Sequence, residues 1–117
     1  MVTYQEYGRT NERRPLTYAV VTSSANHSNL ENIRTANLAQ AGIGNSSQAT
    51  ADKAIVWLSY NVHGNEPSSS EAALLTAYTL VASNSDEVLN YLEKSVIFID
   101  PTINPDGRDR YVNWYNQ

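Results

Sequence analysis

Two short apolar segments, separated by a helix-forming segment, constrain the fold of this chain most strongly. Residues 54–61 (AIVWLSYN) and 96–99 (VIFI) are rich in β-branched and aromatic side chains, which favours buried strands. Residues 71–82 (EAALLTAYTLVA) between them favour a helix, and residues 87–94 favour a second, shorter one. A strand, a crossover helix and a strand form the parallel unit of α/β proteins. The sequence therefore predicts an α/β fold.

The amino-terminal part of the chain predicts a β-hairpin. Residues 3–7 and 16–22 have strand character, and the polar segment 8–15 (GRTNERRP) favours a turn between them. We expect this hairpin to lie at an edge of the sheet and the charged side chains of its turn to face solvent. The small and polar residues 44–52 (GNSSQATAD) predict a surface loop.

Capping-box spacings predict the starts of two helices. Ser28 is followed by Glu31, and Ser68 is followed by Glu71, each three residues apart. Gly42 is in the usual position for a helix end. The apolar side chains that share one face of the second helix are Leu74, Leu75, Tyr78 and Val81.

Composition limits the classes of function. With 117 residues and 41% hydrophobic content, the chain is long enough for one modest globular domain and too short for two. The net charge of -4 and the lack of a basic cluster argue against a nucleic-acid partner. No apolar run reaches the roughly 18 residues that span a bilayer, so we expect no membrane partner. Because there is no cysteine, any metal must be bound by His, Asp or Glu.

A histidine and a glutamate follow the first apolar strand directly. His63 and Glu66 are three residues apart, and both side-chain types bind zinc. On a continuing strand they would face opposite sides, so a shared metal requires the chain to turn near Val62, as Gly64 and Pro67 favour. The pair also fits a loop histidine beside a helix-capping glutamate, and on the motif alone this alternative stays open.

A second motif follows the second strand. Asn104, Pro105, Asp106 and Gly107 form a strong turn sequence, in which proline sets φ and glycine takes the left-handed position. Because sites in α/β sheets lie at the carboxyl ends of strands, we expect this segment to share a site with His63.

The ordered set YGRTNERRPL, WLSYNVHGNEPSSSEA and FIDPTINPDGRDR resembles the zinc metallocarboxypeptidases of the carboxypeptidase A-like class, in particular a bacterial branch. The likeness extends from Tyr7 to at least Arg110. It implies that residues 1–117 are the amino-terminal portion of a zinc carboxypeptidase-like catalytic domain with a three-layer α/β/α fold. We then expect a partial mixed sheet with an amino-terminal hairpin and flanking helices. The resemblance to the bacterial branch favours a periplasmic or extracellular location for the full-length protein.

The resemblance also implies a site. His63 and Glu66 would be two of three Zn²⁺ ligands, and Asn104, Pro105, Asp106 and Gly107 would form a site-shaping loop. The third ligand, an Asn-Arg pair and the base glutamate of the family have no match in this chain, so we expect the chain alone to be inactive. Arg108 and Arg110 could bind a substrate carboxylate, and bracing roles are equally compatible with their positions.

Several other residues are candidates with simpler structural interpretations. His27 fits a solvated loop position, Asp100 the end of a strand, and Glu71 a helix cap. Trp57 and Tyr60 fit core and rim positions better than substrate platforms.

Three functions remain open at this point. The first is a peptidase that hydrolyses a peptide bond next to a terminal carboxylate. The second is a zinc-dependent amidohydrolase that acts on acylated amino acids, and the third is a non-catalytic binding module. Because an open sheet edge and uncovered apolar faces promote association, we also expect the isolated chain to self-associate.

Overall fold

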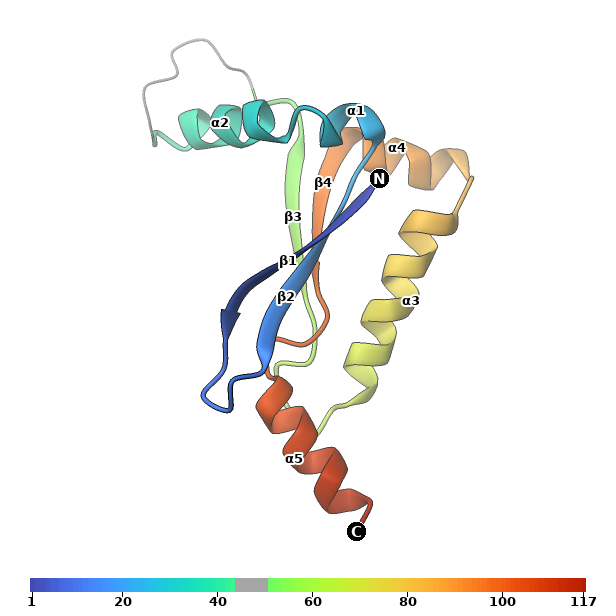
Figure 1. Ribbon diagram of the computed structural model, residues 1–117. Helices are drawn as coiled ribbons and strands as arrows, with labels where there is room; N and C mark the ends of the chain where they lie inside the picture. The colour runs from blue at the N-terminus through green and yellow to red at the C-terminus, as the bar shows by residue number, and fades with distance from the viewer. Residues whose placement is uncertain (44–50) are drawn as a thin grey trace.

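A four-stranded mixed sheet forms the centre of the fold, in a computed structural model that describes residues 1–43 and 51–117. The strands are β1 (Val2–Arg9), β2 (Pro15–Val21), β3 (Ala54–Ser59) and β4 (Ser95–Asp100). The strand order is β1-β2-β4-β3. β1 and β2 form an antiparallel hairpin at one edge, β2 pairs antiparallel with β4, and β4 pairs in parallel with β3 (Figure 1). The predicted edge hairpin and parallel pair are both confirmed.

Helices cover both faces of this sheet. The helices of the described residues are α1 (Ser24–His27), α2 (Leu30–Gln40), α3 (Ser68–Ala82), α4 (Asp86–Lys94) and α5 (Pro105–Tyr115). α3 and α4 form the crossover that connects β3 to β4, and α5 extends from the end of the molecule where β3 and β4 finish (Figure 1). None of the helices within residues 1–43 and 51–117 has the length and apolar character needed to span a membrane.

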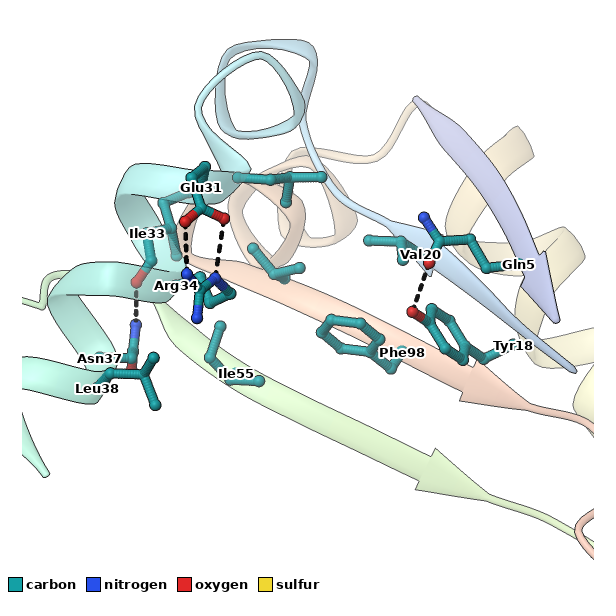
Figure 2. Close-up of a pocket in the computed structure, with 12 residues that line it drawn as sticks. Gln5, Tyr18, Val20, Glu31, Ile33, Arg34, Asn37, Leu38, Ile55 and Phe98 are labelled. Atoms are coloured by element: carbon teal, nitrogen blue, oxygen red, sulfur yellow. Dashed lines mark hydrogen bonds and ion pairs between the residues drawn. The ribbon is translucent and has the colours of Figure 1, made fainter. Parts of the chain in front are cut away.

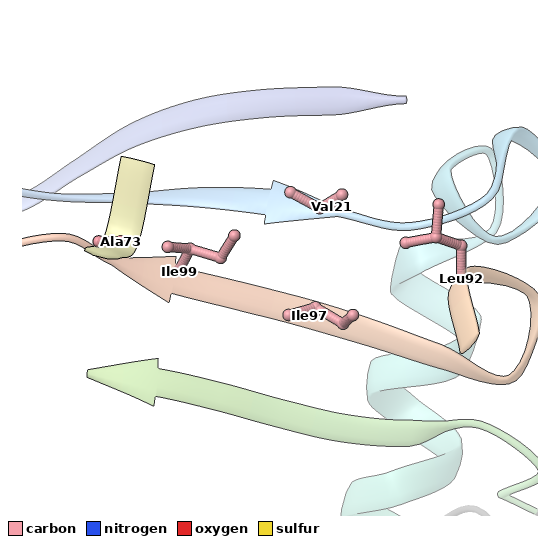
Figure 3. Packing of buried hydrophobic residues seen from close by; sticks show 5 residues of the cluster. All are labelled: Val21, Ala73, Leu92, Ile97 and Ile99. Atoms are coloured by element: carbon pink, nitrogen blue, oxygen red, sulfur yellow. The ribbon is translucent and has the colours of Figure 1, made fainter. Parts of the chain in front are cut away.

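The alternation of side chains along the strands produces two core clusters. On one face, residues of the sheet pack with Ala73 of α3 and Leu92 of α4 (Figure 3). The sheet residues are Val21, Ile97 and Ile99. On the other face, Val20 and Val96 pack with Ile33 of α2. Neighbouring residues of one strand enter opposite clusters because successive side chains point to opposite faces. β4 contributes to both clusters, which explains its continuous apolar run.

The orientation of α3 differs from the pattern in the sequence. Leu80 packs against the core, but the four apolar residues that share one face in the sequence pattern are 54–72% exposed: Leu74, Leu75, Tyr78 and Val81. Its buried positions are Ser70 and Ala73, whose small side chains allow the helix backbone to lie close to the sheet. The face of α3 with small side chains is therefore buried, because it lets the helix lie close to the sheet. The face with the four large side chains points outward.

Neither predicted capping box forms. Ser28 is the residue that ends α1, and α2 begins after Asn29 without a side-chain cap. α3 starts at Ser68 after Pro67, also without a side-chain cap. The predicted helix end at Gly42 is confirmed, since its φ of 75° lies in the left-handed region.

β3 is an edge strand, so the prediction that it is buried was wrong. Ile55 is 46% exposed and Trp57 is 49% exposed, because no strand lies beyond β3 within the described residues. Trp57 instead stacks on Phe98 of β4, with ring centroids 5.2 Å apart. Most of the loop predicted at residues 44–52 lies outside the described residues.

Candidate metal centre

The buried side chain of Asn61 stabilises the turn that follows β3 through hydrogen bonds. Its φ of 55° is in the left-handed region, which asparagine tolerates better than most residues, and it is 2% exposed. Its side-chain amide donates to the backbone carbonyls of His63 at 2.9 Å and Glu66 at 3.0 Å. Its backbone N–H donates to Ser69 Oγ at 2.9 Å. The sequence analysis missed this residue, although an asparagine between a strand and a Gly-containing loop is a known sign of left-handed backbone.

The turn brings the two predicted metal ligands together. His63 Nδ1 lies 3.4 Å from Glu66 Oε2, and the two side chains are 70% and 62% exposed. The Glu66 N–H donates to the His63 carbonyl at 3.1 Å, which fixes the turn between them. Two ligands at about 2.0–2.2 Å from a tetrahedral zinc ion lie roughly 3.3–3.6 Å from each other. The donor types and their separation therefore fit one zinc ion.

At this site the described residues supply two metal-binding side chains, His63 and Glu66. Within residues 1–43 and 51–117, no three His, Cys, Asp or Glu side chains are grouped so that they could hold a metal ion. The second histidine of the chain, His27, is the last residue of α1, at the opposite end of the sheet (Figure 1). It is partly buried in a helix, so the prediction of a solvated loop position was wrong.

The NPDG motif begins a helix and does not form a turn or a loop. Asn104 is the N-cap of α5, and its Oδ1 accepts a hydrogen bond from the Gly107 N–H at 3.0 Å. Pro105 is favourable in the first turn because its missing N–H would have no intrahelical acceptor there. The predicted left-handed Gly107 was wrong, since among the described glycines the positive φ belongs to Gly42. Pro105, Asp106 and Gly107 are therefore the first turn of α5.

The HGNE loop and the start of α5 are in direct contact. Asn104 Nδ2 donates to the Val62 carbonyl at 2.9 Å. A Cβ atom on Gly64 would lie 2.2 Å from the carbonyl carbon of Gly107, a distance that real structures do not tolerate. Gly64 therefore allows the two backbones to touch. The structure places the two motifs side by side, at the carboxyl end of the parallel strands.

The hairpin turn also contacts α5. Asp106 Oδ1 accepts hydrogen bonds from Thr10 Oγ1 at 2.7 Å and from Arg14 Nη1 at 2.8 Å, and its Oδ2 accepts one from the Glu12 N–H at 3.3 Å. Arg14 Nε also donates to Asp109 at 2.7 Å. Arg9, Glu12 and Arg13 are exposed, as predicted for a solvated charged turn, whereas Arg14 is partly buried and pairs with α5. Arg110 of α5 also donates to Glu12. We call the residues that make these bonds the hairpin–α5 clamp: Thr10, Glu12, Arg14, Asp106, Asp109 and Arg110.

The clamp favours the ionised forms of Glu12 and Asp106, because it lowers the pKa of both side chains. Hydrogen bonds from Arg14 and Arg110 lower the pKa of Glu12 below its usual value. Desolvation acts to raise the pKa of Asp106, but hydrogen bonds from Thr10 and Arg14 outweigh it, and the pKa is lowered. Hydrogen bonds to Glu12, Asp106 and Asp109 raise the pKa of the Arg14 guanidinium.

The two arginines that follow NPDG have different surroundings. Arg110 belongs to the clamp, because its Nε donates to Glu12 Oε1 at 2.7 Å, and this contact favours a bracing role. Arg108 Nη2 lies 3.4 Å from Glu71 Oε1, so Glu71 pairs with α5 and does not cap α3. Arg108 directly follows Gly107, whose backbone contacts Gly64 of the HGNE loop. Its role in substrate binding stays a prediction.

Asp100, at the end of β4, is 1% exposed, and its Oδ2 accepts a hydrogen bond from the Tyr7 hydroxyl at 2.5 Å. Burial raises the pKa of Asp100. Burial and the hydrogen bond to Asp100 raise the pKa of Tyr7 to about 12. Tyr7 was missed because its partner is 93 residues away in the sequence.

A cavity of about 480 Å³ lies between α2 and the sheet, away from the HGNE loop. Its lining is mostly apolar, with Tyr18 and Phe98 on the sheet and Ile33 and Leu38 on α2 (Figure 2). Neither His63 nor Glu66 lines it. The cavity therefore belongs to the α2 packing interface and not to the candidate metal centre.

The fold and the site define a class, an α/β protein with an exposed, adjacent histidine and glutamate at the carboxyl end of its parallel strands. A family model described as zinc carboxypeptidase matches residues 1–117, the whole chain. The chain belongs to this family, and the family indicates a hydrolase of the peptidase type or a related one. A comparison with curated proteins gives no match.

Proposed function

We propose that this chain supplies His63 and Glu66 as two zinc ligands of a metallocarboxypeptidase-type peptidase. The reaction would be hydrolysis of a peptide bond next to a terminal carboxylate. The observation that carries the proposal is the 3.4 Å separation of His63 Nδ1 and Glu66 Oε2, which suits adjacent ligands of one zinc ion. Membership of the zinc carboxypeptidase family supports the same function.

When bound, zinc polarises the scissile carbonyl and activates a water molecule in this class of reaction. The neutral imidazole of His63 and the carboxylate of Glu66 would hold the ion. Asn61 orients both residues through their backbone carbonyls. Arg108 would bind the substrate carboxylate with its planar guanidinium, and in doing so would exchange its contact with Glu71.

The proposed site also implies a limit on the isolated chain. Catalytic zinc sites commonly have three protein ligands, and the described residues supply two. We therefore expect no zinc-dependent turnover of peptide substrates by the 117-residue chain in a hydrolysis assay. Turnover that a chelator removes and zinc restores would show that this limit is wrong.

The zinc site is tested by calorimetric titration of the chain with Zn²⁺. We expect weak binding by the wild type and a dissociation constant at least tenfold higher for Glu66→Gln, because the amide that replaces the carboxylate is a poor zinc ligand. Glu71→Gln is the matched control. It makes the same chemical change five residues along the chain, and we expect it to leave zinc binding unchanged. Equal affinities for the wild type and Glu66→Gln would contradict the proposed site.

A further inference from the structure

The two ends of the Asn104 side-chain amide bind different parts of the fold. Oδ1 accepts the Gly107 N–H at 3.0 Å and caps α5, while Nδ2 donates to the Val62 carbonyl at 2.9 Å. Val62 directly precedes His63. The side chain therefore links the first turn of α5 to the residue that enters the candidate metal loop.

Gly107 makes this link possible. A Cβ atom at residue 107 would lie 2.6 Å from Asn104 Nδ2 and 2.9 Å from its Cγ. The Asn104 amide thus occupies the space where a side chain of residue 107 would be. On the other side, the backbone of Gly107 touches Gly64, which lies between the two predicted ligands.

Some hydrogen bonds of the HGNE loop lie within its own segment, and others attach it to the rest of the fold. The Asn61 amide joins the His63 and Glu66 carbonyls to each other, but Asn61 belongs to the same segment. The Ile103 N–H donates to the Tyr60 carbonyl at 3.1 Å, which attaches the end of β3. The hydrogen bond from Asn104 to the Val62 carbonyl lies further along the segment, directly before His63. Because the hairpin–α5 clamp holds the start of α5, the bond ties the loop to a fixed element.

We infer that Asn104 is a positioning residue for the His63–Glu66 pair, acting through the Val62 carbonyl and the Gly64–Gly107 backbone contact. The inference deepens the proposed zinc site and rests on it for its functional meaning. Its structural part concerns the metal-free chain and can be measured without zinc.

The first test is amide hydrogen exchange of the metal-free chain, with the variant Asn104→Ser. Serine is also a good N-cap, so α5 keeps a capping oxygen while the donor to Val62 is lost. We expect faster exchange at the Glu66 amide, whose hydrogen bond to His63 depends on the loop conformation. The matched control is Asn37→Ser in α2, where the Asn37 amide bonds the Ile33 carbonyl at 3.0 Å. The control should leave exchange at Glu66 unchanged, and unchanged exchange in Asn104→Ser would overturn the inference.

The second test is the zinc titration of the same variants. Residues that orient metal ligands typically contribute 10–100-fold to affinity, so we expect about a tenfold weaker affinity in Asn104→Ser and no change in Asn37→Ser. If wild-type zinc binding does not depend on Glu66, the proposed zinc site fails, and hydrogen exchange still decides the positioning role. If binding depends on Glu66 and Asn104→Ser binds equally well, the positioning role is overturned and the zinc site stands.

Gly107→Ala provides an independent variant if Asn104→Ser does not fold. Alanine has the higher helix propensity, which offsets the loss of the Asn104 cap in α5. Its Cβ would displace the Asn104 amide, and we expect faster exchange at Glu66 and weaker zinc binding, as in Asn104→Ser. Wild-type exchange and affinity in Gly107→Ala would count against the inference.

Discussion

At the scale of single residues, Tyr7 and Asp100 form a long-range polar contact across the sheet. The Tyr7 hydroxyl, on β1, reaches past β2 to the buried carboxylate at the end of β4. Burial of a carboxylate is unfavourable unless it is hydrogen-bonded, and the Tyr7 hydroxyl supplies such a bond. The pair therefore stabilises the position of β1 at the edge of the sheet.

We predict that Tyr7→Phe destabilises the chain in a pH-dependent way. Burial raises the pKa of Asp100, so the stability that this group contributes is greatest at low pH and is lost as pH rises through the folded-state pKa. The Tyr7 hydrogen bond opposes that loss, because it favours the ionised carboxylate. Hydrogen bonds to charged groups contribute about 1.5–3 kcal/mol, so we expect a loss of this size at pH 7 and a smaller one near pH 4.

Urea unfolding at the two pH values measures this difference. Tyr4→Phe on the same strand is the control, since Tyr4 is 69% exposed and we expect a change within about 0.5 kcal/mol. An equal loss at both pH values in Tyr7→Phe would show that the hydroxyl does not bond the ionised form of Asp100.

At the scale of secondary-structure elements, the clamp joins the hairpin to α5. Its bonds connect residues more than 90 positions apart, such as Thr10 with Asp106 and Arg14 with Asp109. Exposed ion pairs individually contribute little, but here several hydrogen bonds converge on one carboxylate, that of Asp106. The clamp therefore holds the hairpin turn and the NPDG segment in contact.

We predict that in Asp106→Asn the melting temperature falls less steeply than in the wild type as the pH is lowered. The folded-state pKa of Asp106 is lowered, so its contribution is present above the unfolded pKa near 3.9 and is lost as pH falls further. This sign is opposite to that of Asp100. The measurement is the melting temperature between pH 7 and pH 3. Asp52→Asn, at a carboxylate that is 72% exposed, is the control and should keep the wild-type slope.

Local pattern predicted the elements and their pairing in the sheet, but not the side-chain contacts that fix the helices. The apolar run of β4 and the closeness of His63 to Glu66 are local properties, and both were predicted correctly. The buried face of α3 was not, because the distance at which Ala73 packs on the sheet depends on the sheet itself. The NPDG motif fits a turn and a helix start equally well, since Asn and Pro favour both. The contact of Gly64 with Gly107 requires the fold to be known.

At the scale of the whole molecule, the chain is thin and leaves large apolar side chains exposed. Its radius of gyration is 16.7 Å and its extents are 58 × 35 × 18 Å. A compact domain of this length has a radius of gyration of about 13 Å. The outer face of α3 includes Leu75 and Tyr78, which are 67% and 72% exposed, and on α5 Trp114 is 71% exposed.

We predict that the isolated chain self-associates as its concentration rises, because association removes these apolar surfaces from water. Sedimentation velocity over a range of concentrations measures the effect. Leu75→Lys should reduce association by placing a charge on the outer face of α3, whereas Asn84→Lys, which adds the same charge outside the helices, should reduce it less. A monomer at high concentration would rule the prediction out.

The strand order has a consequence for how this chain folds during its synthesis. β4 lies between β2 and β3, and the ribosome makes it after both of them. Until residues 95–100 leave the ribosome, β2 and β3 share no neighbour, and the nascent chain can form the β1–β2 hairpin but not the sheet. The open edge of β2 and the unpaired β3 are then accessible to chaperones or to other nascent chains. Among the four described strands, the one translated last is thus the one that joins β2 to β3, and the HGNE loop does not contact α5 until translation has passed residue 107.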